Sequence, residues 1–363
     1  RAMSGRRRSS LLNLFKKSSK KGDDKAKDAD DGGQSPTQGS DANQGDQREE
    51  KIGGQKMSSA PPAPPAPEGP VVPPTPPSDD MRISAGETYS SQSIPISQPP
   101  ADMFRLRVGP NYRRNGKKEP SGAALYDLVA VDICRSTKGK MEETFDYFKP
   151  VLGETGVAGS NIPYSFVVTA NLPVEEPSMF STPGTGPSFV IVFHFTASPT
   201  LLEGVKGISS GKGATPAVKL LDAWCRDSAK DSACMGRFKA MCMIDDIEKQ
   251  GFPSFISKFN GKPVLINKSG TFVRYCEGDG HGTLVKDDGG TSKACKAINM
   301  LINVHVFAFI ARKGLFSLQQ SFKKMRLNVA FTIEGRTDEE LPEVVLGCCK
   351  LSEIDMDKFR VLD

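Results

Sequence analysis

The pattern of hydrophobic and polar residues changes near residue 103. From Met103, the segment MFRLRV alternates apolar and polar side chains, as a half-buried strand does. Runs of β-branched and aromatic residues bounded by Gly, Pro and Asn predict further strands at 124–134, 164–172 and 189–195. The alternation returns at 237–247, and apolar runs at 327–334 and 344–351 predict the last strands.

Helical spacing is confined to a few segments. Val218, Leu221 and Cys225 recur at spacings of three and four, which predicts a helix over 216–226. A short helix is predicted at 254–259 and an amphipathic helix at 313–324. Strands at 263–267 and 271–277 are expected to form a hairpin over Lys268–Gly270, and 303–309 another strand. Many strands, few helices and no βαβ rhythm predict an α+β fold with a mainly antiparallel β-sheet.

The first 100 residues have a different composition. Residues 22–55 are rich in Gly, Asp, Gln and Ser, and Pro61–Pro77 contains 10 prolines in 17 residues. Too little apolar surface is present to offset the chain entropy of folding. The sequence therefore predicts a disordered region at 1–100 and one folded domain at 101–363. The proline-rich stretch at 60–77 favours polyproline II, either as a spacer or as a ligand for an SH3- or WW-type protein partner.

Charge separates the N-terminal segment from the domain. Residues 101–363 carry 34 Lys/Arg and 30 Asp/Glu, a nearly neutral balance that argues against a nucleic-acid partner. Residues 1–21 carry eight basic residues and no acidic one. No apolar run approaches the length of a membrane-spanning helix, and no secretory signal follows the basic start, so a cytoplasmic protein is expected.

The N-terminal segment has the composition of a peripheral membrane contact. Apolar and basic residues alternate in short blocks, and such a segment can lie in an anionic lipid interface. Two other interpretations stay open, namely a solvated basic tail and an organellar transit peptide. Phosphorylation of Ser9 and Ser10 would cancel positive charge and act as an electrostatic switch. The candidate contact residues are Arg6, Arg7, Arg8, Leu11, Leu12, Leu14, Phe15, Lys16 and Lys17.

Catalytic and metal-binding motifs are weak in this sequence. The glycine loop GISSGKG at 207–213 lacks the spacing of a phosphate loop. Cys276 and His281 have no second ligand pair, and no nucleophile motif is present. We therefore expect a non-enzymatic protein without metal or cofactor. The eight cysteines are expected to be reduced thiols, with Cys348 and Cys349 on opposite faces of a strand.

Several motifs in a fixed order resemble one family, the C-terminal domain of the plant ENHANCED DISEASE RESISTANCE proteins. They are FRLRVGPNYRRNGKKEPSGAALYDLVAVDI at 104–133, FVVTANLP at 166–173, RFKAMCMIDD at 237–246, NGKPVLI at 260–266, NVHVFAFIARKGL at 303–315 and FTIEGRTDEELPEVVLGCCKLSEID at 331–355. The resemblance covers roughly residues 103–360.

The resemblance implies a lipid- or membrane-associated regulatory domain rather than a known enzyme. Longer family members carry START and pleckstrin-homology modules before this domain, and the first 100 residues here hold neither. A protein–protein adaptor without a lipid ligand is the alternative. The acids Asp132 and Glu343, which lie in the matching motifs, are expected to be structural.

Overall fold

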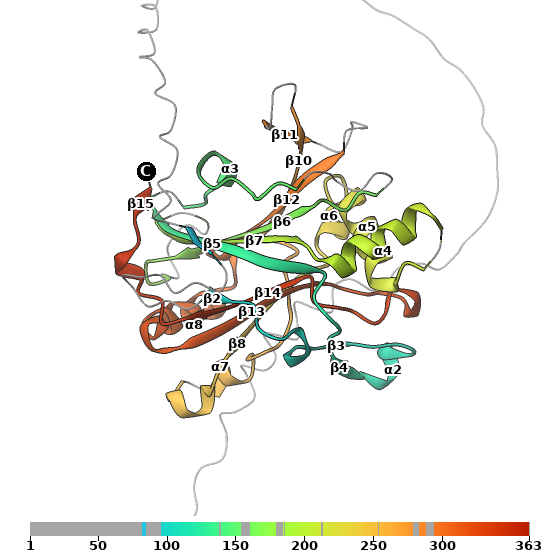
Figure 1. Cartoon of the computed structure of the whole chain (residues 1–363). Helices are drawn as coiled ribbons and strands as arrows, with labels where there is room; N and C mark the ends of the chain where they lie inside the picture. The colour runs from blue at the N-terminus through green and yellow to red at the C-terminus, as the bar shows by residue number, and fades with distance from the viewer. Residues whose placement is uncertain are drawn as a thin grey trace, which may run out of the picture. The chain divides into compact units, whose positions relative to one another are not determined.

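The computed structural model describes residues 82–84, 96–137, 139–153, 160–178, 184, 186–211, 213–252, 254–278, 283–287 and 294–362. The chain divides into two units, 1–69 and 70–363, and every described residue belongs to the second. The described residues form two β-sheets with helices around them, which confirms the α+β fold (Figure 1).

The larger sheet has eight strands and the smaller has five. The larger is antiparallel except where β6 (Ser165–Pro173) pairs with β12 (Cys295–Asn303) and β5 (Tyr126–Ser136) pairs with β15 (Val361–Leu362). The larger sheet runs in the order β1 (Arg82–Ser84), β5 (Tyr126–Ser136), β7 (Ser188–Ala197), β6 (Ser165–Pro173), β12 (Cys295–Asn303), β10 (Gly270–Glu277) and β11 (Leu284–Asp287), with β15 (Val361–Leu362) also on β5. The smaller runs β2 (Ile96–Ser97), β14 (Gly347–Ser352), β13 (Arg326–Ile333), β8 (Phe238–Ile244) and β9 (Val264–Leu265).

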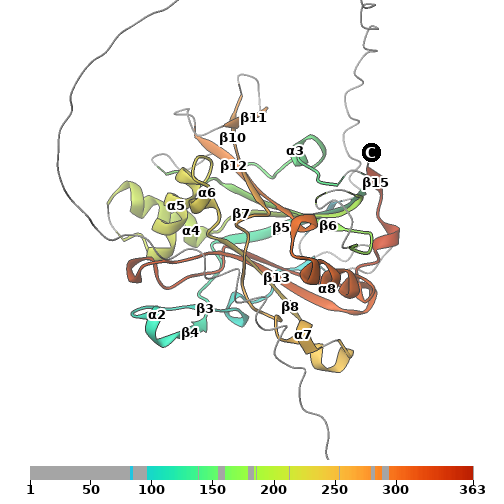
Figure 2. The ribbon, with the colours of Figure 1, turned by 180° about the vertical axis from the view of Figure 1, so that it is seen from behind.

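Helices lie at the ends and faces of the two sheets. In both ribbon views α4 (Pro199–Ser209), α5 (Pro216–Asp227) and α6 (Ser232–Met235) gather at one end of the sheets. In the same views α8 (Phe309–Gln319) lies at the other end, while α7 (Ser254–Ser257) projects beyond the smaller sheet (Figures 1 and 2). A separate hairpin is formed by β3 (Arg105–Arg107) and β4 (Lys118–Pro120). The helices are α2 (Tyr112–Asn115), α3 (Thr144–Tyr147), α4 (Pro199–Ser209), α5 (Pro216–Asp227), α6 (Ser232–Met235), α7 (Ser254–Ser257) and α8 (Phe309–Gln319). Short 3-10 turns are Ala101–Met103, Ile247–Gln250, Val304–Val306, Phe322–Lys324, Asp338–Glu340 and Met356–Lys358.

Aromatic rings fill the space between the two sheets. Phe166 and Phe195 from the larger sheet meet Phe331 from the smaller one, with ring centroids 6.4 and 6.1 Å apart. Phe238 stacks on Phe331 at 5.7 Å and on Trp224 of α5 at 5.6 Å. These side chains are at most 1% exposed. The centroid distances are those of close-packed aromatic pairs, so this part of the core is tightly packed.

The α4–α5 pair shows why local sequence fixes the helices. Ser198 and Thr215 cap the two helices by accepting hydrogen bonds from backbone N–H groups of Leu201 and Val218, and each is followed by proline at the first helical position. The predicted helix at 216–226 is confirmed as α5, with Val218, Leu221 and Cys225 buried. The glycine loop at 207–213 begins as the last turn of α4 and is not the strand-to-helix loop of a phosphate site.

Two elements lie in the stretch expected to be without structure. Ile83 in β1 and Ile96 in β2 are buried in the main core. Each isoleucine is followed by a serine, too short an alternation to stand out within a polar, proline-rich region. The expectation for residues 1–100 was therefore too broad at its C-terminal end.

Two local predictions were wrong. The expected hairpin over Lys268–Gly270 does not form, because β9 pairs with β8 in the smaller sheet and β10 pairs with β11 and β12 in the larger. The expected strand at 303–309 is the end of β12, a 3-10 turn and the start of α8. In both places a short apolar run spans the boundary of two elements. Such a run does not show from sequence alone where one element ends or which strand it pairs with.

Candidate functional site

Segments far apart in the sequence meet around the carboxylate of Glu343. Lys239 of β8 places its Nζ atom 2.7 Å from Glu343 Oε1 and 2.8 Å from Oε2. Arg107 of β3 approaches the same carboxylate at 3.8 Å. Pro263, just before β9, lines the adjoining hollow. Four of the motifs that carry the family resemblance thus supply one site.

The backbone holds the Glu343 carboxylate in place. Gly335 N–H donates a hydrogen bond of 2.9 Å to Glu343 Oε1, and Glu343 N–H donates one of 3.0 Å to the Arg107 carbonyl. Lys239 and Glu343 are each only 2% exposed. Burial lowers the pKa of Lys239, while the neighbouring Glu343 carboxylate opposes that shift. A buried charge pair of this kind ties the β3–β4 hairpin, β8 and the 334–343 segment together.

A hollow of about 170 Å³ on one side of Glu343 is rich in cations. Arg107 is already engaged, since its guanidinium contacts Glu334 at 2.9 Å and lies over the Tyr112 ring at 4.9 Å. The Lys118 ammonium has no acidic partner among the described residues. The hollow therefore offers an uncompensated positive charge. Its lining is Leu106, Arg107, Lys118, Lys239, Pro263, Leu265 and Glu343.

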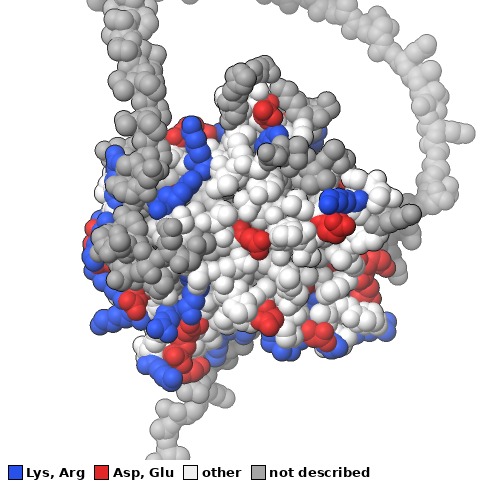
Figure 3. All heavy atoms as spheres, viewed as in Figure 1, with Lys and Arg blue, Asp and Glu red and all other residues white. Residues whose placement is uncertain are grey.

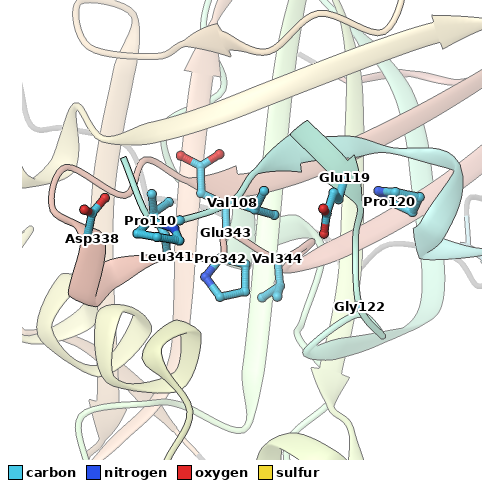
Figure 4. A pocket seen from close by; sticks show the side chains of 11 residues that line it. Val108, Pro110, Glu119, Pro120, Gly122, Asp338, Leu341, Pro342, Glu343 and Val344 are labelled. Atoms are coloured by element: carbon cyan, nitrogen blue, oxygen red, sulfur yellow. The ribbon is translucent and has the colours of Figure 1, made fainter. Parts of the chain in front are cut away.

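A second hollow of about 540 Å³ also touches Glu343 but has the opposite character. Figure 4 shows Val108, Pro110, Pro342 and other apolar side chains between two carboxylates, Asp338 at one end and Glu119 at the other. No lysine or arginine lines it. Such a floor suits an apolar segment that carries positive charge, whereas the smaller hollow suits an anionic group.

The titratable side chains that line the two hollows are carboxylates, lysines and one arginine. No serine, threonine, cysteine or histidine is among the lining residues. The buried pair Ser188 and His305 lies elsewhere, with Ser188 Oγ 2.8 Å from His305 Nε2. The Ser188 hydroxyl also donates to the Gly139 carbonyl, so it is held as a structural donor.

The structure bears on possible metal ligands and on the state of the cysteines. No group of metal-ligating side chains is brought together within the described part of the chain, and His281 lies outside it. All eight cysteines are free thiols, and Cys348 and Cys349 are both buried in β14. Burial raises the pKa of Cys348 to about 12, with the charge of Asp127 adding to the effect, so this thiol is unreactive at neutral pH.

An apolar and basic loop adjoins the smaller hollow. Phe259, Val264 and Leu265 are 52, 46 and 39% exposed, and Leu265 also lines the hollow. Residues 249–276 contain five Lys/Arg and no Asp/Glu. The exposed residues Lys258, Lys262 and Lys268 belong to this stretch. We call Lys258–Lys268 the basic–apolar loop.

One face of the molecule carries mixed charges. On the face drawn in Figure 3, positive and negative side chains are interspersed along the margins and the middle carries few charges. The described part of this face shows no extended patch of one sign. No helix among the described residues is long and apolar enough to cross a bilayer.

The site residues predicted from sequence lie outside the described residues. This applies to Arg6–Arg8, Ser9, Ser10, Leu11, Leu12, Leu14, Phe15, Lys16 and Lys17, and to the proline-rich stretch. The two acids expected to be structural, Asp132 and Glu343, are both buried, and each forms an ion pair. Sequence reasoning missed Arg107, Lys118 and Lys239, whose convergence depends on sheet pairing over more than a hundred residues. Val264 and Leu265 of the basic–apolar loop were assigned only to a strand, and Phe259 to a short helix.

The fold is α+β, and the candidate site consists of two hollows that share Glu343. Residues 97–355 match the family described as Protein ENHANCED DISEASE RESISTANCE 2, C-terminal, and the chain belongs to this family. The match begins after β1 and ends before β15. Comparisons with curated proteins and with solved structures gave no significant match.

Proposed function

We propose that this chain is a non-enzymatic regulatory protein that associates peripherally with an anionic membrane surface. The observation that carries the proposal is the basic–apolar loop, in which Phe259, Val264 and Leu265 are exposed among lysines. Exposed apolar side chains beside cations are typical of segments that enter a lipid interface. The cation-lined hollow next to Leu265 supplies a place for an anionic headgroup.

The energetics favour reversible binding. Fully burying a large apolar side chain contributes roughly 1.5–3 kcal/mol, and these three residues are already about half buried, so each adds about half of that. Each lysine near an anionic surface contributes about 1 kcal/mol. The loop is held by the fold, so little ordering entropy opposes the contact. The N-terminal segment Arg6–Lys17 supplies a second set of basic and apolar residues, and binding through both is stronger than through either alone.

The alternative function is a protein–protein adaptor. The hollow of about 540 Å³ favours it, because an apolar floor between two carboxylates suits a basic peptide better than an anionic lipid. The two functions predict opposite responses to anionic vesicles, so one experiment separates them.

The test is sedimentation of the full-length chain with vesicles of phosphatidylcholine alone or mixed with phosphatidylserine. We expect binding to the anionic vesicles at low salt and release as salt rises. The triple variant Phe259→Ser, Val264→Ser, Leu265→Ser should weaken binding about tenfold or more. Binding that is absent, or equal on both vesicle types, would rule out the membrane proposal and favour the adaptor.

A matched control uses exposed apolar residues on other elements. Val285, Ile310 and Val361 are 41, 37 and 49% exposed, and their triple substitution by serine removes similar apolar area. It should leave vesicle binding unchanged. A separate variant, Arg6→Glu, Arg7→Glu, Arg8→Glu, measures how much the N-terminal segment contributes to vesicle binding. Phosphorylation of Ser9 and Ser10 should also weaken vesicle binding.

A further inference from the structure

The outer edge of the larger sheet is covered by a short strand from outside the matched domain. In β1, Arg82 pairs with Asp132, Ile83 with Val131 and Ser84 with Ala130 of β5. The family match begins at residue 97, so β5 lies inside it and β1 does not. The domain therefore carries a strand acceptor that is filled by a separate part of the chain.

Arg82 is held by a preformed set of acceptors. Its Nη2 lies 2.7 Å from Asp132 Oδ2 and its Nε lies 3.1 Å from Oδ1, a two-pronged contact. The same Nη2 donates to the Lys149 carbonyl at 2.8 Å. A planar guanidinium satisfies all three bonds at once, and an ammonium cannot reproduce that geometry.

The acceptor is oriented by the domain itself. His194 of β7 places Nε2 2.7 Å from Asp132 Oδ2, and since a carboxylate only accepts, the imidazole donates. Asp132 and His194 are each 1% exposed, whereas Arg82 is only part-buried. Burial raises the pKa of Asp132, but the hydrogen bonds from His194 and Arg82 outweigh burial and hold that pKa below its ordinary value. A carboxylate buried in this way requires a cation, and the domain supplies none of its own among the residues described around it.

The neighbouring position adds an apolar anchor. Ile83 is buried in the main core, and Ser84 is exposed. The recognised pattern is therefore an extended segment with arginine on one face of the sheet and a branched apolar residue on the other. Further along β5, β15 pairs with Arg135 and Ser136.

We infer that the edge of β5 at residues 130–132 is a binding site for an extended, arginine-bearing peptide segment, and that Arg82–Ser84 is its ligand in the same chain. Strand addition to a sheet edge supplies main-chain hydrogen bonds, and the side-chain sites select the sequence. Among the described residues, β1 is joined to the sheet by three residue pairs, so another protein's segment with the same pattern can replace it. A tethered ligand acts at an effective concentration on the order of millimolar, so exchange favours a tight or locally concentrated partner.

The experiment releases β1 in the full-length chain and offers its sequence back as a peptide. The released chain carries Arg82→Ala and Ile83→Ser, and the probe is a fluorescent peptide with the sequence DMRISAG of residues 80–86. Binding is measured by anisotropy. We expect the probe to bind the released chain at least tenfold more tightly than the wild-type chain, in which the edge is occupied. Probes with the arginine replaced by alanine or lysine should bind the released chain at least tenfold more weakly.

Two further measurements make each outcome decisive. Hydrogen exchange at residues 130–132 should speed up in the released chain and slow again with the probe, while β13 stays protected. Asp132→Asn in the released chain should abolish binding. Equal binding of the arginine and alanine probes, or no binding to a folded released chain, would overturn the inference. Loss of the cooperative unfolding transition in the released chain would also overturn it, because a ligand that can exchange is not required for folding.

Discussion

The β5 edge of the larger sheet and the β9 edge of the smaller sheet differ in how they are covered. The β5 edge of the larger sheet is covered by β1 and β15, and its buried Asp132 is matched by Arg82. The β9 edge of the smaller sheet ends in two residues, Val264 and Leu265, that stay exposed beside lysines. An unpaired edge is a site of association. This chain therefore closes one edge with its own segment and leaves an apolar, basic edge exposed.

The largest effect is expected where β8 supports the open edge. Lys239 pairs with Leu265 in the sheet and with Glu343 through its side chain. Glu343→Ala would leave a buried ammonium without a partner, so we expect a loss of about 3–5 kcal/mol in the free energy of unfolding. Urea denaturation measures it. The double variant Lys239→Met, Glu343→Leu removes both charges and should be clearly more stable than Glu343→Ala; equal loss would show that the charges do not dominate.

Substitutions at the closed β5 edge should cost less unfolding free energy than Glu343→Ala. Arg82→Ala removes hydrogen bonds to a charged group, which contribute about 1.5–3 kcal/mol, and Arg82 is part-buried and partly replaceable by water. We expect a loss near the lower end of that range, and Arg82→Lys should recover part of it. A loss in Arg82→Ala as large as in Glu343→Ala would mean that β1 is an integral strand and the two edges do not differ.

The turn that precedes β9 at the open edge depends on the backbone conformation of Gly261. Gly261 has φ of +67°, in the left-handed region that favours glycine. A side chain here meets only Met243 at 3.6 Å, so the cost comes from the backbone. Gly261→Val should lower the free energy of unfolding by roughly 1–3 kcal/mol. Gly122→Val, at an open position without positive φ, is the control; equal denaturation midpoints would argue against this turn.

The smallest expected effect is a pH dependence at the closed edge. Burial lowers the pKa of His194, and Asp132 opposes the shift only in part. Below about 6.5 the unfolded histidine binds a proton while the folded one stays neutral, so stability falls as pH drops. The slope is at most about 1.4 kcal/mol per pH unit. Urea midpoints between pH 7.5 and 5.5 measure it, and His194→Gln should flatten the dependence; an unchanged slope would assign it to other groups.

Sequence pattern predicted the parts of the fold that are local. Long β-branched runs became β5, β6 and β7, and the capped helix after Thr215 became α5. The helix α4 was missed because its glycines lower helix propensity, yet Gly204 lets α4 approach Val218 of α5 closely. Pairing choices failed where they depend on distant partners, as with β9, which joins β8 and not β10.

The candidate site was predictable only in pieces. The motifs containing Arg107, Lys239, Pro263 and Glu343 were each visible, but their meeting point depends on how the hairpin, β8 and the 334–343 segment pack. Arg82 could not be found, because a lone arginine before an isoleucine in a polar region carries no periodic signal. Its role depends on the buried acid Asp132, fifty residues later in the chain.

The open edge can be tested directly by placing a fluorophore on it. The chain has a single tryptophan, Trp224, which is 1% exposed in the core. In the variant Phe259→Trp, a second indole stands on the basic–apolar loop. Brominated lipids in anionic vesicles quench only fluorophores that reach the acyl region. We expect strong quenching in this variant and little in the wild-type chain. Vesicle binding without quenching of the new indole would contradict the proposed membrane contact.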